Sequence, residues 1–315
     1  MENTPTQLSE RDSTVLSIML LVGVIGLLGL TLDKYGGSRV EVVIKEPVAT
    51  PSPFAEIELE ASAAYVFDVN KEEALFSKNS ETQLPLASLT KIMTALVAYE
   101  SAPVDSVIAI EKESIDIEGD SGLSEGDNWL LSDLLGFTLL VSSNDGAHAV
   151  ASAVESIPSD FEDEAEEETS FIDRMNSRAS ELGLVQTYFI NETGLDPNLS
   201  ISGGYGSARD TVELFRRAIS IAPELLEDTA YSEVEYSNGG EEMLVAENTN
   251  EAVNSIPGLI ASKTGFTDLA GGNLVIAFDS GLNHPIIITV LGSSIDGRFS
   301  DVNKLVSASI KAVGR

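Results

Sequence analysis

The spacing of apolar and polar residues divides the chain into three kinds of segment. Residues 14–32 are apolar and uncharged, over about the length that a helix needs to cross a bilayer. Residues 33–60 are more polar and contain Pro47, Pro51 and Pro53, which predicts an extended, semi-rigid linker. From residue 61 onward the apolar positions recur with the periods of strands and helices. We therefore predict one globular domain over residues 61–315.

Within this domain the pattern predicts a mixture of helices and antiparallel strands. The segments Ser62–Val69 and Glu73–Ser77 flank a polar turn and predict a hairpin. Helices are predicted over residues 88–101, 132–154, 171–182, 208–221 and 301–313, and strands over 233–236, 243–247, 272–278 and 285–291. This order predicts an α/β fold of the α+β type, a mainly antiparallel sheet flanked by helices, with a helical subdomain over about residues 103–225.

The composition restricts the partners of the protein. Eighteen Lys and Arg stand against 51 Asp and Glu, which gives a formal net charge of −33. The electric field of such a negative charge repels nucleic acid and anionic membrane surfaces. Solubility in a salty medium is the simplest role for this charge, and binding of cations or of a basic partner is the alternative. The absence of cysteine excludes a disulfide scaffold, a thiolate nucleophile and a thiolate metal site.

A serine and a lysine lie at the start of the first predicted helix. Ser88 and Lys91 are three residues apart, so their side chains share one helix face. The positive end of the helix dipole favours a developing alkoxide on the serine. The lysine can act as a base only when neutral, so its surroundings must lower its pKa from about 10.4. Alone this pattern is weak, because serine is a common helix cap.

Two further polar motifs follow in order along the chain. Ser142–Asn144 follows an apolar run, where polar side chains need partners, and a helix junction with satisfied hydroxyls is the alternative interpretation. Lys263–Gly265 combines a positive charge, a hydroxyl and a close approach to the backbone, and an exposed strand end is its alternative. Together, S-x-x-K, a serine–asparagine motif and K-T-G form the signature of penicillin-binding proteins and serine β-lactamases.

The chain resembles the low-molecular-mass penicillin-binding proteins of the serine-type D-alanyl-D-alanine carboxypeptidase family over roughly residues 61–313. The run Leu86–Thr94 is similar to the nucleophile helix of the family, although the middle residue of the second motif is commonly glycine there and is Ser143 here. Further similar segments are residues 126–127, 133–145, 189–195, 207–210, 263–271 and 297–299. We expect the protein to lack the C-terminal β domain and amphipathic tail that are usual in the family.

The resemblance implies a β-lactamase/transpeptidase-like fold, an acyl-enzyme mechanism, and no cofactor or metal. It implies that Ser88 is the nucleophile, Lys91 its base, Ser142 the proton relay to the leaving amine, and Asn144 a partner of Lys91 or of the substrate. It also implies that Lys263 assists the relay, that the backbone N–H groups of Ser88 and Phe266 form the oxyanion hole, and that Thr264, beside Gly265, and Arg298 bind the terminal carboxylate. The implied substrate is a peptidoglycan stem peptide ending in D-Ala-D-Ala, and β-lactam antibiotics are implied to acylate the serine.

Three alternatives use all or part of the same residues. A D,D-endopeptidase acting on peptidoglycan cross-links would differ only in the shape of its groove. A serine β-lactamase would need a deacylating carboxylate, for which Glu192 is the one nearby candidate, although its surroundings resemble the carboxypeptidase loop. An anchored, non-enzymatic wall-binding module would have a decayed site. We interpret His148 and His284 as structural, because neither has a Ser-His-Asp partner set.

The apolar segment 14–32 is predicted to be an uncleaved membrane anchor that replaces the family's tail. Asp33, Lys34 and Tyr35 follow it instead of the small residues of a cleavage site. Arg11 is the only basic residue in the sequence before this segment. This shortage of positive charge on the N-terminal side by itself favours a cytoplasmic domain. Because this bias is small and the implied substrate lies outside the cell, we expect residues 1–13 in the cytoplasm and a single-pass cell-membrane protein with its catalytic domain extracytoplasmic.

Overall fold

The computed structural model describes residues 52–119, 121–156, 169–240 and 243–314. The predicted membrane anchor, residues 33–51 of the predicted linker and residues 157–168, which belong to an acidic run, lie outside this part of the chain. Within the described ranges, no helix combines the length and the apolar character that crossing a bilayer requires.

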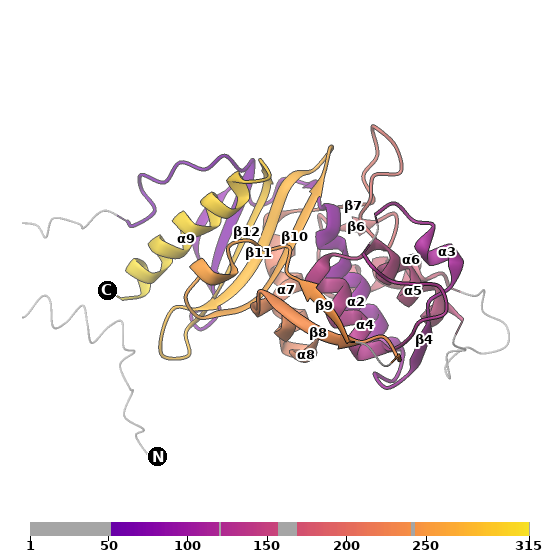
Figure 1. Ribbon diagram of the computed structural model, residues 1–315. Coiled ribbons are helices and arrows are strands. Elements are labelled where there is room, and N and C mark those ends of the chain that lie inside the picture. Colours follow the sequence, from indigo (N-terminus) through magenta and orange to yellow (C-terminus); the bar gives the residue numbers. More distant parts are fainter. Residues whose placement is uncertain (1–51, 120, 157–168, 241–242, 315) are drawn as a thin grey trace, which may run out of the picture. The chain divides into compact units, whose positions relative to one another are not determined.

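The centre of the domain is a five-stranded antiparallel sheet with the strand order β10-β11-β12-β1-β2 (Figure 1). Its strands are β1 (Ala63–Asp68), β2 (Glu73–Lys78), β10 (Leu259–Thr267), β11 (Gly271–Asp279) and β12 (Pro285–Ser293). Strand β1 pairs with β12, where Val66 lies opposite Ile288. Segments from the two ends of the domain therefore share one sheet.

Both faces of this sheet are covered, and alternate residues of β11 enter two separate cores. Leu274 and Ile276 belong to the core beneath helix α9 (Gly297–Val313). Val275 and Ala277 belong to the core shared with helix α7 (Ala208–Ile221) and the other helices. This covering explains why the seven residues from Gly272 to Phe278 are all buried, since a strand buried on both faces has no polar side.

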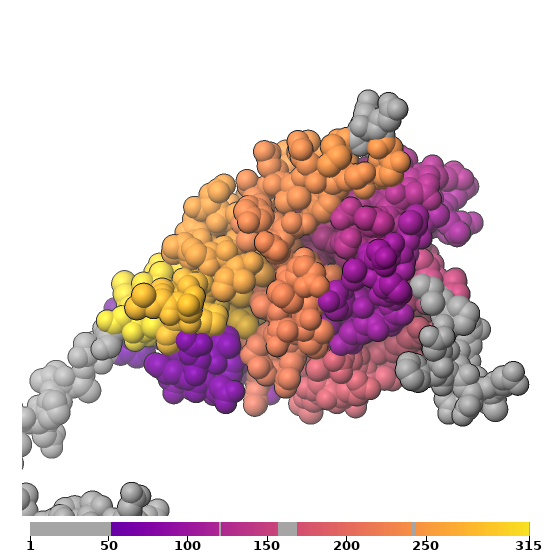
Figure 2. Space-filling view, turned by 90° about the horizontal axis from the view of Figure 1, so that it is seen from below, coloured from indigo at the N-terminus to yellow at the C-terminus, as the bar shows by residue number. Residues whose placement is uncertain are grey.

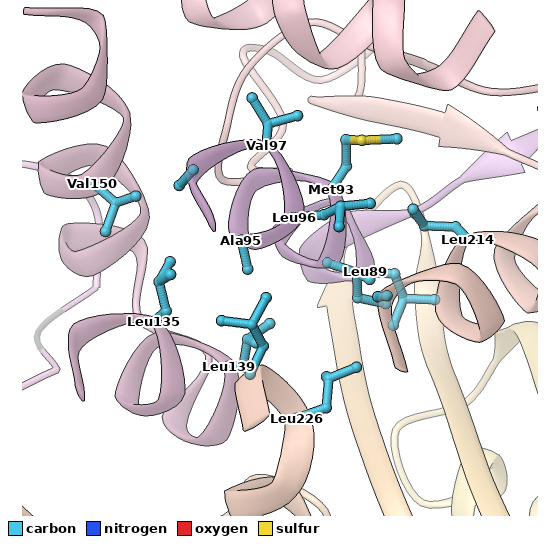
Figure 3. Close-up of a cluster of buried hydrophobic side chains, with 14 of the residues drawn as sticks. Leu89, Met93, Ala95, Leu96, Val97, Leu135, Leu139, Val150, Leu214 and Leu226 are labelled. Atoms are coloured by element: carbon cyan, nitrogen blue, oxygen red, sulfur yellow. The ribbon is translucent and has the colours of Figure 1, made fainter. Parts of the chain in front are cut away.

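The helices beside the sheet surround α2, which is buried along most of its length (Figure 3). The longer helices of this part are α2 (Lys91–Ser101), α4 (Leu131–Val141), α5 (Asn144–Glu155) and α6 (Phe171–Glu181). Leu96 of α2 and Leu135 of α4 belong to one hydrophobic core with Val150 of α5. The short elements are β3 (Leu84–Pro85), η2 (Ala87–Thr90), β4 (Val107–Ala109), α3 (Lys112–Ile115), β5 (Asn128–Leu130), β6 (Tyr188–Phe189), β7 (Gly204–Gly206), α8 (Glu224–Glu227), η3 (Asp228–Ala230), β8 (Glu233–Ser237), β9 (Met243–Glu247) and η4 (Val253–Ser255).

The predicted antiparallel sheet flanked by helices is confirmed, but the structure differs from the prediction in several places, among them the start of α9 at Gly297, four residues before the predicted start. The first helix is preceded by the 3₁₀ turn η2, so Ser88 lies in that turn and the α-helix begins at Lys91. The helical block over 132–154 is interrupted at Ser142, whose φ of 63° ends α4. Strand β10 was not predicted, because the buried polar run Ser262–Thr264 interrupts its apolar pattern.

Residues 52–60, which the sequence analysis assigned to the linker, pack against the domain. Phe54 is buried and stacks on Phe76 of β2, with ring centroids 5.6 Å apart. Asp301 of α9 accepts hydrogen bonds from the backbone N–H groups of Glu60 and Ala61 at 3.2 and 2.8 Å. In Figure 2 the indigo N-terminal residues accordingly lie beside the yellow C-terminal ones.

Candidate active site

Ser88 and Lys91 lie together where the 3₁₀ turn η2 passes into α2. Lys91 Nζ lies 3.1 Å from Ser88 Oγ, 2.6 Å from Asn144 Oδ1 and 2.7 Å from the Thr193 carbonyl oxygen. The last two oxygens can only accept hydrogen bonds. A neutral amine therefore uses its two N–H groups on them and directs its lone pair at Ser88 Oγ, which is the arrangement that a general base requires.

Burial favours the neutral form of Lys91. Lys91 is fully buried, and desolvation lowers its pKa from 10.5 to about 7, while the carboxylates of Glu192 and Asp145 act in the opposite direction. Desolvation disfavours the charged form of an amine. Near neutral pH a large fraction of Lys91 is thus unprotonated, as the sequence analysis required of a base.

The second and third motifs meet at a second lysine. Lys263 Nζ donates hydrogen bonds to Ser142 Oγ and to the Thr264 carbonyl oxygen, both at 2.8 Å. Burial and the neighbouring positive charges of Lys91 and Arg298 lower the pKa of Lys263 well below its ordinary value. An amine of lowered pKa that holds a hydroxyl can exchange a proton through it. Ser142 is therefore placed as the outer end of a proton path.

Strand β10 approaches the nucleophile closely because it carries a glycine there. A Cβ atom on Gly265 would lie 3.0 Å from the Leu86 carbonyl oxygen and 3.2 Å from Ser88 N. Asn273 of β11 holds the same turn by donating to the Pro85 and Leu86 carbonyl oxygens, each at 3.0 Å. The edge of the sheet and the turn η2 are thus fixed against each other, which is the geometry needed if Ser88 N and Phe266 N are to share one oxyanion.

A candidate carboxylate site lies beside Gly265. Arg298 Nη1 donates to the Gly265 carbonyl oxygen at 2.9 Å, and the Arg298 Nε atom is buried without a hydrogen-bond partner among the residues that the structure describes. Thr264 Oγ1 lies 2.6 Å from Thr249 Oγ1, which also lies 3.3 Å from the Leu140 carbonyl oxygen. Sequence reasoning missed Thr249. It follows β9 in an ordinary polar stretch, and nothing in the local sequence signals that β9 leads to the third motif.

The loop before β5 is bound to the second motif. Asn144 Nδ2 donates to the Glu118 carbonyl oxygen at 2.8 Å. Ser121 Oγ donates to Asp145 Oδ2 at 2.8 Å and lies 2.7 Å from Ser143 Oγ. Asn144 therefore bridges Lys91 and this loop. The serine that stands where glycine is common supplies one of the loop contacts.

A groove of about 400 Å³ begins at Ser142 and runs between this loop and β9. Its walls include Ser142, Asn144, Phe137, Val245 and Glu247. In Figure 2 the orange surface of the β8–β9 hairpin lies beside the magenta surface around β5, and Asn128 N donates to the Asn238 carbonyl oxygen across this contact at 3.1 Å. The groove therefore adjoins Ser142, the residue that the resemblance implies will meet the leaving group.

His148 and Glu192 form a hydrogen-bonded pair beside Lys91 that sequence reasoning did not connect. His148 Nδ1 lies 2.7 Å from Glu192 Oε1, so this carboxylate already has a partner. A usable signal existed in the sequence, because His148 follows Asn144 by one helical turn and so shares its face. His284, in contrast, pairs with the buried Asp68 at 2.7 Å, on the sheet.

All nine residues named from the sequence lie in one contiguous region, linked through these contacts or through neighbours in β10. They are Ser88, Lys91, Ser142, Asn144, Lys263, Thr264, Gly265, Phe266 and Arg298. A serine beside a buried lysine of lowered pKa, with a second hydroxyl on a second such lysine, is the arrangement expected of a serine acyl-transfer enzyme whose base is a lysine.

The comparisons with known proteins identify the family. The family model described as D-alanyl-D-alanine carboxypeptidase matches residues 48–294. The chain therefore belongs to the D-alanyl-D-alanine carboxypeptidase family, as the motifs predicted.

Individual relatives agree with this assignment. The D-alanyl-D-alanine carboxypeptidase DacF of Bacillus subtilis is 28% identical over 81% of this chain and 66% of its own length. A D-alanyl-D-alanine endopeptidase of Pseudomonas aeruginosa is 30% identical over 72% of this chain and 71% of its own length. The ampicillin-bound penicillin-binding protein D2 of Listeria monocytogenes superposes with a TM-score of 0.68 at 28% identity, covering 82% of this chain and 99% of that one.

Proposed function

We propose that this protein hydrolyses the terminal D-Ala-D-Ala bond of peptidoglycan stem peptides through an ester on Ser88. Lys91 takes the hydroxyl proton, and Ser88 Oγ bonds to the carbonyl carbon between the two D-alanines. The C–N bond then breaks, and the amine leaves with the proton that Lys91 took, relayed through Ser142 with the help of Lys263. Lys91, neutral again, takes a proton from the water that hydrolyses the ester and returns it to Ser88 Oγ. The observation that carries this proposal is the position of Lys91 Nζ, 3.1 Å from Ser88 Oγ with both other contacts made to acceptors.

The remaining groups hold the substrate. Ser88 N and Phe266 N would stabilise the oxyanion, an effect worth about 10²–10³ in rate for each donor. Thr264 and Arg298 would bind the terminal carboxylate, and this charge would in turn favour protonated Lys263. A β-lactam presents a similar carbonyl and carboxylate, so it would acylate the same serine.

Labelling with penicillin tests the nucleophile. The wild-type chain is expected to gain the mass of one benzylpenicillin and to release D-alanine from a pentapeptide, whereas Ser88→Ala is expected to do neither. Ser200→Ala is the matched control, because Ser200 is an exposed serine outside these contacts, and it should label like wild type. Equal labelling of wild type and Ser88→Ala would refute the assignment.

The groove at Ser142 favours a second activity, cleavage of D,D-cross-links. In a cross-link the leaving amine belongs to a D-centre that carries a long side chain in place of the methyl group of D-alanine. With the carboxylate held at Thr264, such a side chain would extend along the groove past Ser142 towards Val245, which is 54% exposed. The similarity to a D-alanyl-D-alanine endopeptidase supports the same proposal.

Placing a bulky residue in the groove should slow one of the two activities and spare the other. Val245→Trp is expected to slow cleavage of a cross-linked muropeptide dimer several-fold while D-alanine release from the monomeric pentapeptide continues. Chromatography of digested wall material measures both products. Equal rates of dimer cleavage in wild type and variant would exclude the groove as the site for the larger leaving group.

We also propose that residues 14–32 anchor the chain in the cell membrane with the catalytic domain outside. The uncharged apolar sequence of this segment and the extracytoplasmic position of peptidoglycan support this. Protease added to intact spheroplasts should digest the domain, and complete protection in intact spheroplasts with digestion after lysis would refute this orientation.

A further inference from the structure

Two helices and one loop form a closed frame around Lys91. On α2, Lys91 and Thr94 are one turn apart, and they donate hydrogen bonds to the carbonyl oxygens of two consecutive loop residues, Thr193 and Glu192, both at 2.7 Å. On α5, Asn144 accepts from Lys91, and His148, one turn further along, binds the Glu192 carboxylate at 2.7 Å. The frame therefore fixes the Glu192 side chain between the base and a histidine.

We propose that His148 is a positioning residue for Lys91, acting through Glu192: its positive charge balances the Glu192 carboxylate, so that this carboxylate does not hold the proton on the base. The inference rests on the proposed role of Lys91 as the base. The motifs that define the site contain neither His148 nor Glu192.

The charges around the frame determine the direction of the effect. Lys91 faces the carboxylates of Glu192 and Asp145, which favour its protonated form, and the positive charge of Lys91 in turn lowers the pKa of Lys263 of β10. His148 faces Glu192 and, on its own helix, Glu155, and both raise the pKa of the imidazole. Glu192 is held ionised, because the hydrogen bond and the charge of His148, together with the charge of Lys91, lower the pKa of this carboxyl against the effect of burial.

Loss of His148 and loss of Glu192 should therefore shift the pH profile of activity in opposite directions. The acid limb of kcat/KM reports the ionisation of the base in the free enzyme. His148→Gln leaves the Glu192 charge unbalanced, so the apparent pKa of this limb should rise by about 0.5–1 pH unit. As a result, kcat/KM should fall about 3- to 10-fold at pH values below this pKa and should not change well above it. Glu192→Gln should move the limb down by a similar amount, and the double variant should return it close to wild type.

A purely structural role would behave differently, because it would lower activity equally at every pH. His148→Lys provides the conservative test, since it retains a cation next to Glu192 and should keep the limb near that of wild type. His284→Gln is the matched control: it removes the other imidazole–carboxylate pair, which has the same 2.7 Å distance, and it should leave the limb unmoved.

The experiment measures the pH profile of the acylation rate with fluorescent penicillin, and of D-alanine release, on the full-length chain and these variants. Opposite shifts that cancel in the double variant support the proposal, and unchanged limbs in folded His148→Gln and Glu192→Gln overturn it. If His148→Gln does not fold, Glu192→Gln alone decides by whether its limb moves down. Failure of the wild-type chain to be acylated at any pH would instead refute the proposed function.

Discussion

At the scale of single residues, the site combines motif residues with partners that no local pattern identifies. Ser88, Lys91, Ser142, Asn144 and Lys263 could be found from the sequence, because the chemistry restricts both their types and their order. Nothing in the local sequence pointed to Thr249, and the position of His148 one helical turn after Asn144 did not reveal its partner. Their contacts reach Thr264 and Glu192, 15 and 44 residues away along the chain, and single-sequence patterns report only neighbours within an element.

The contact between Thr249 and Thr264 predicts an effect on carboxylate recognition. Thr249→Val removes a hydroxyl 2.6 Å from Thr264 Oγ1, so the hydroxyl proposed to hold the substrate carboxylate loses its orientation. The loss of one such hydrogen bond is worth about 1 kcal/mol. We expect kcat/KM for the pentapeptide to fall about 5-fold, mainly through KM.

Steady-state kinetics with Thr249→Ser as the control checks this prediction, because serine keeps the hydroxyl and should retain wild-type recognition. A Thr249→Val enzyme with an unchanged KM would show that Thr264 needs no such support.

At the scale of elements, the structure departs from the predicted periodicity where the site lies. Ala87 and Ser142 adopt φ values of 49° and 63°, a left-handed conformation that is unfavourable for residues with a side chain. The first precedes the nucleophile and the second ends α4. Hydrophobic periodicity and helix propensity could predict the helices on either side. They could not predict these turns, because tertiary contacts hold the strained backbone in place.

Two glycines offer a test of how tightly the nucleophile turn is packed. Gly194 and Gly183 both have positive φ, 81° and 73°. A Cβ atom on Gly194 would collide with the Ala87 carbonyl group, whereas a Cβ atom on Gly183 would have no atom within 4 Å. Gly183→Ala should therefore show the backbone cost alone, about 1 kcal/mol or 2–4 °C in Tm.

Gly194→Ala adds a backbone collision next to Ser88. It should lower Tm at least about twice as far as Gly183→Ala and abolish penicillin acylation. Thermal unfolding and labelling of the two variants decide the matter, and similar Tm values for both would mean that the 193–195 loop can move away from the turn without cost.

At the scale of the whole molecule, the charge of −33 should make stability depend on salt. Carboxylates repel one another in the compact state, and the screening length falls from about 10 Å at 0.1 M to about 3 Å at 1 M ionic strength. We expect Tm to rise by several degrees between 0.05 and 1 M NaCl.

The identity of the cation separates screening from specific binding. Sodium, potassium and tetramethylammonium chlorides should act alike if screening is the cause. Stabilisation by millimolar amounts of one cation alone would instead indicate a binding site for that cation.

The pairing of β1 with β12 has a consequence for biosynthesis. A ribosome makes Ser88 early, but the β10 edge that faces it and the β12 strand that holds β1 are made about 170–200 residues later. Contacts between such distant segments form slowly, so the emerging chain has no assembled acylation site. Penicillin sensitivity should thus appear only after the chain is complete. A nascent polypeptide that is still attached to the ribosome would be unreactive toward the antibiotic.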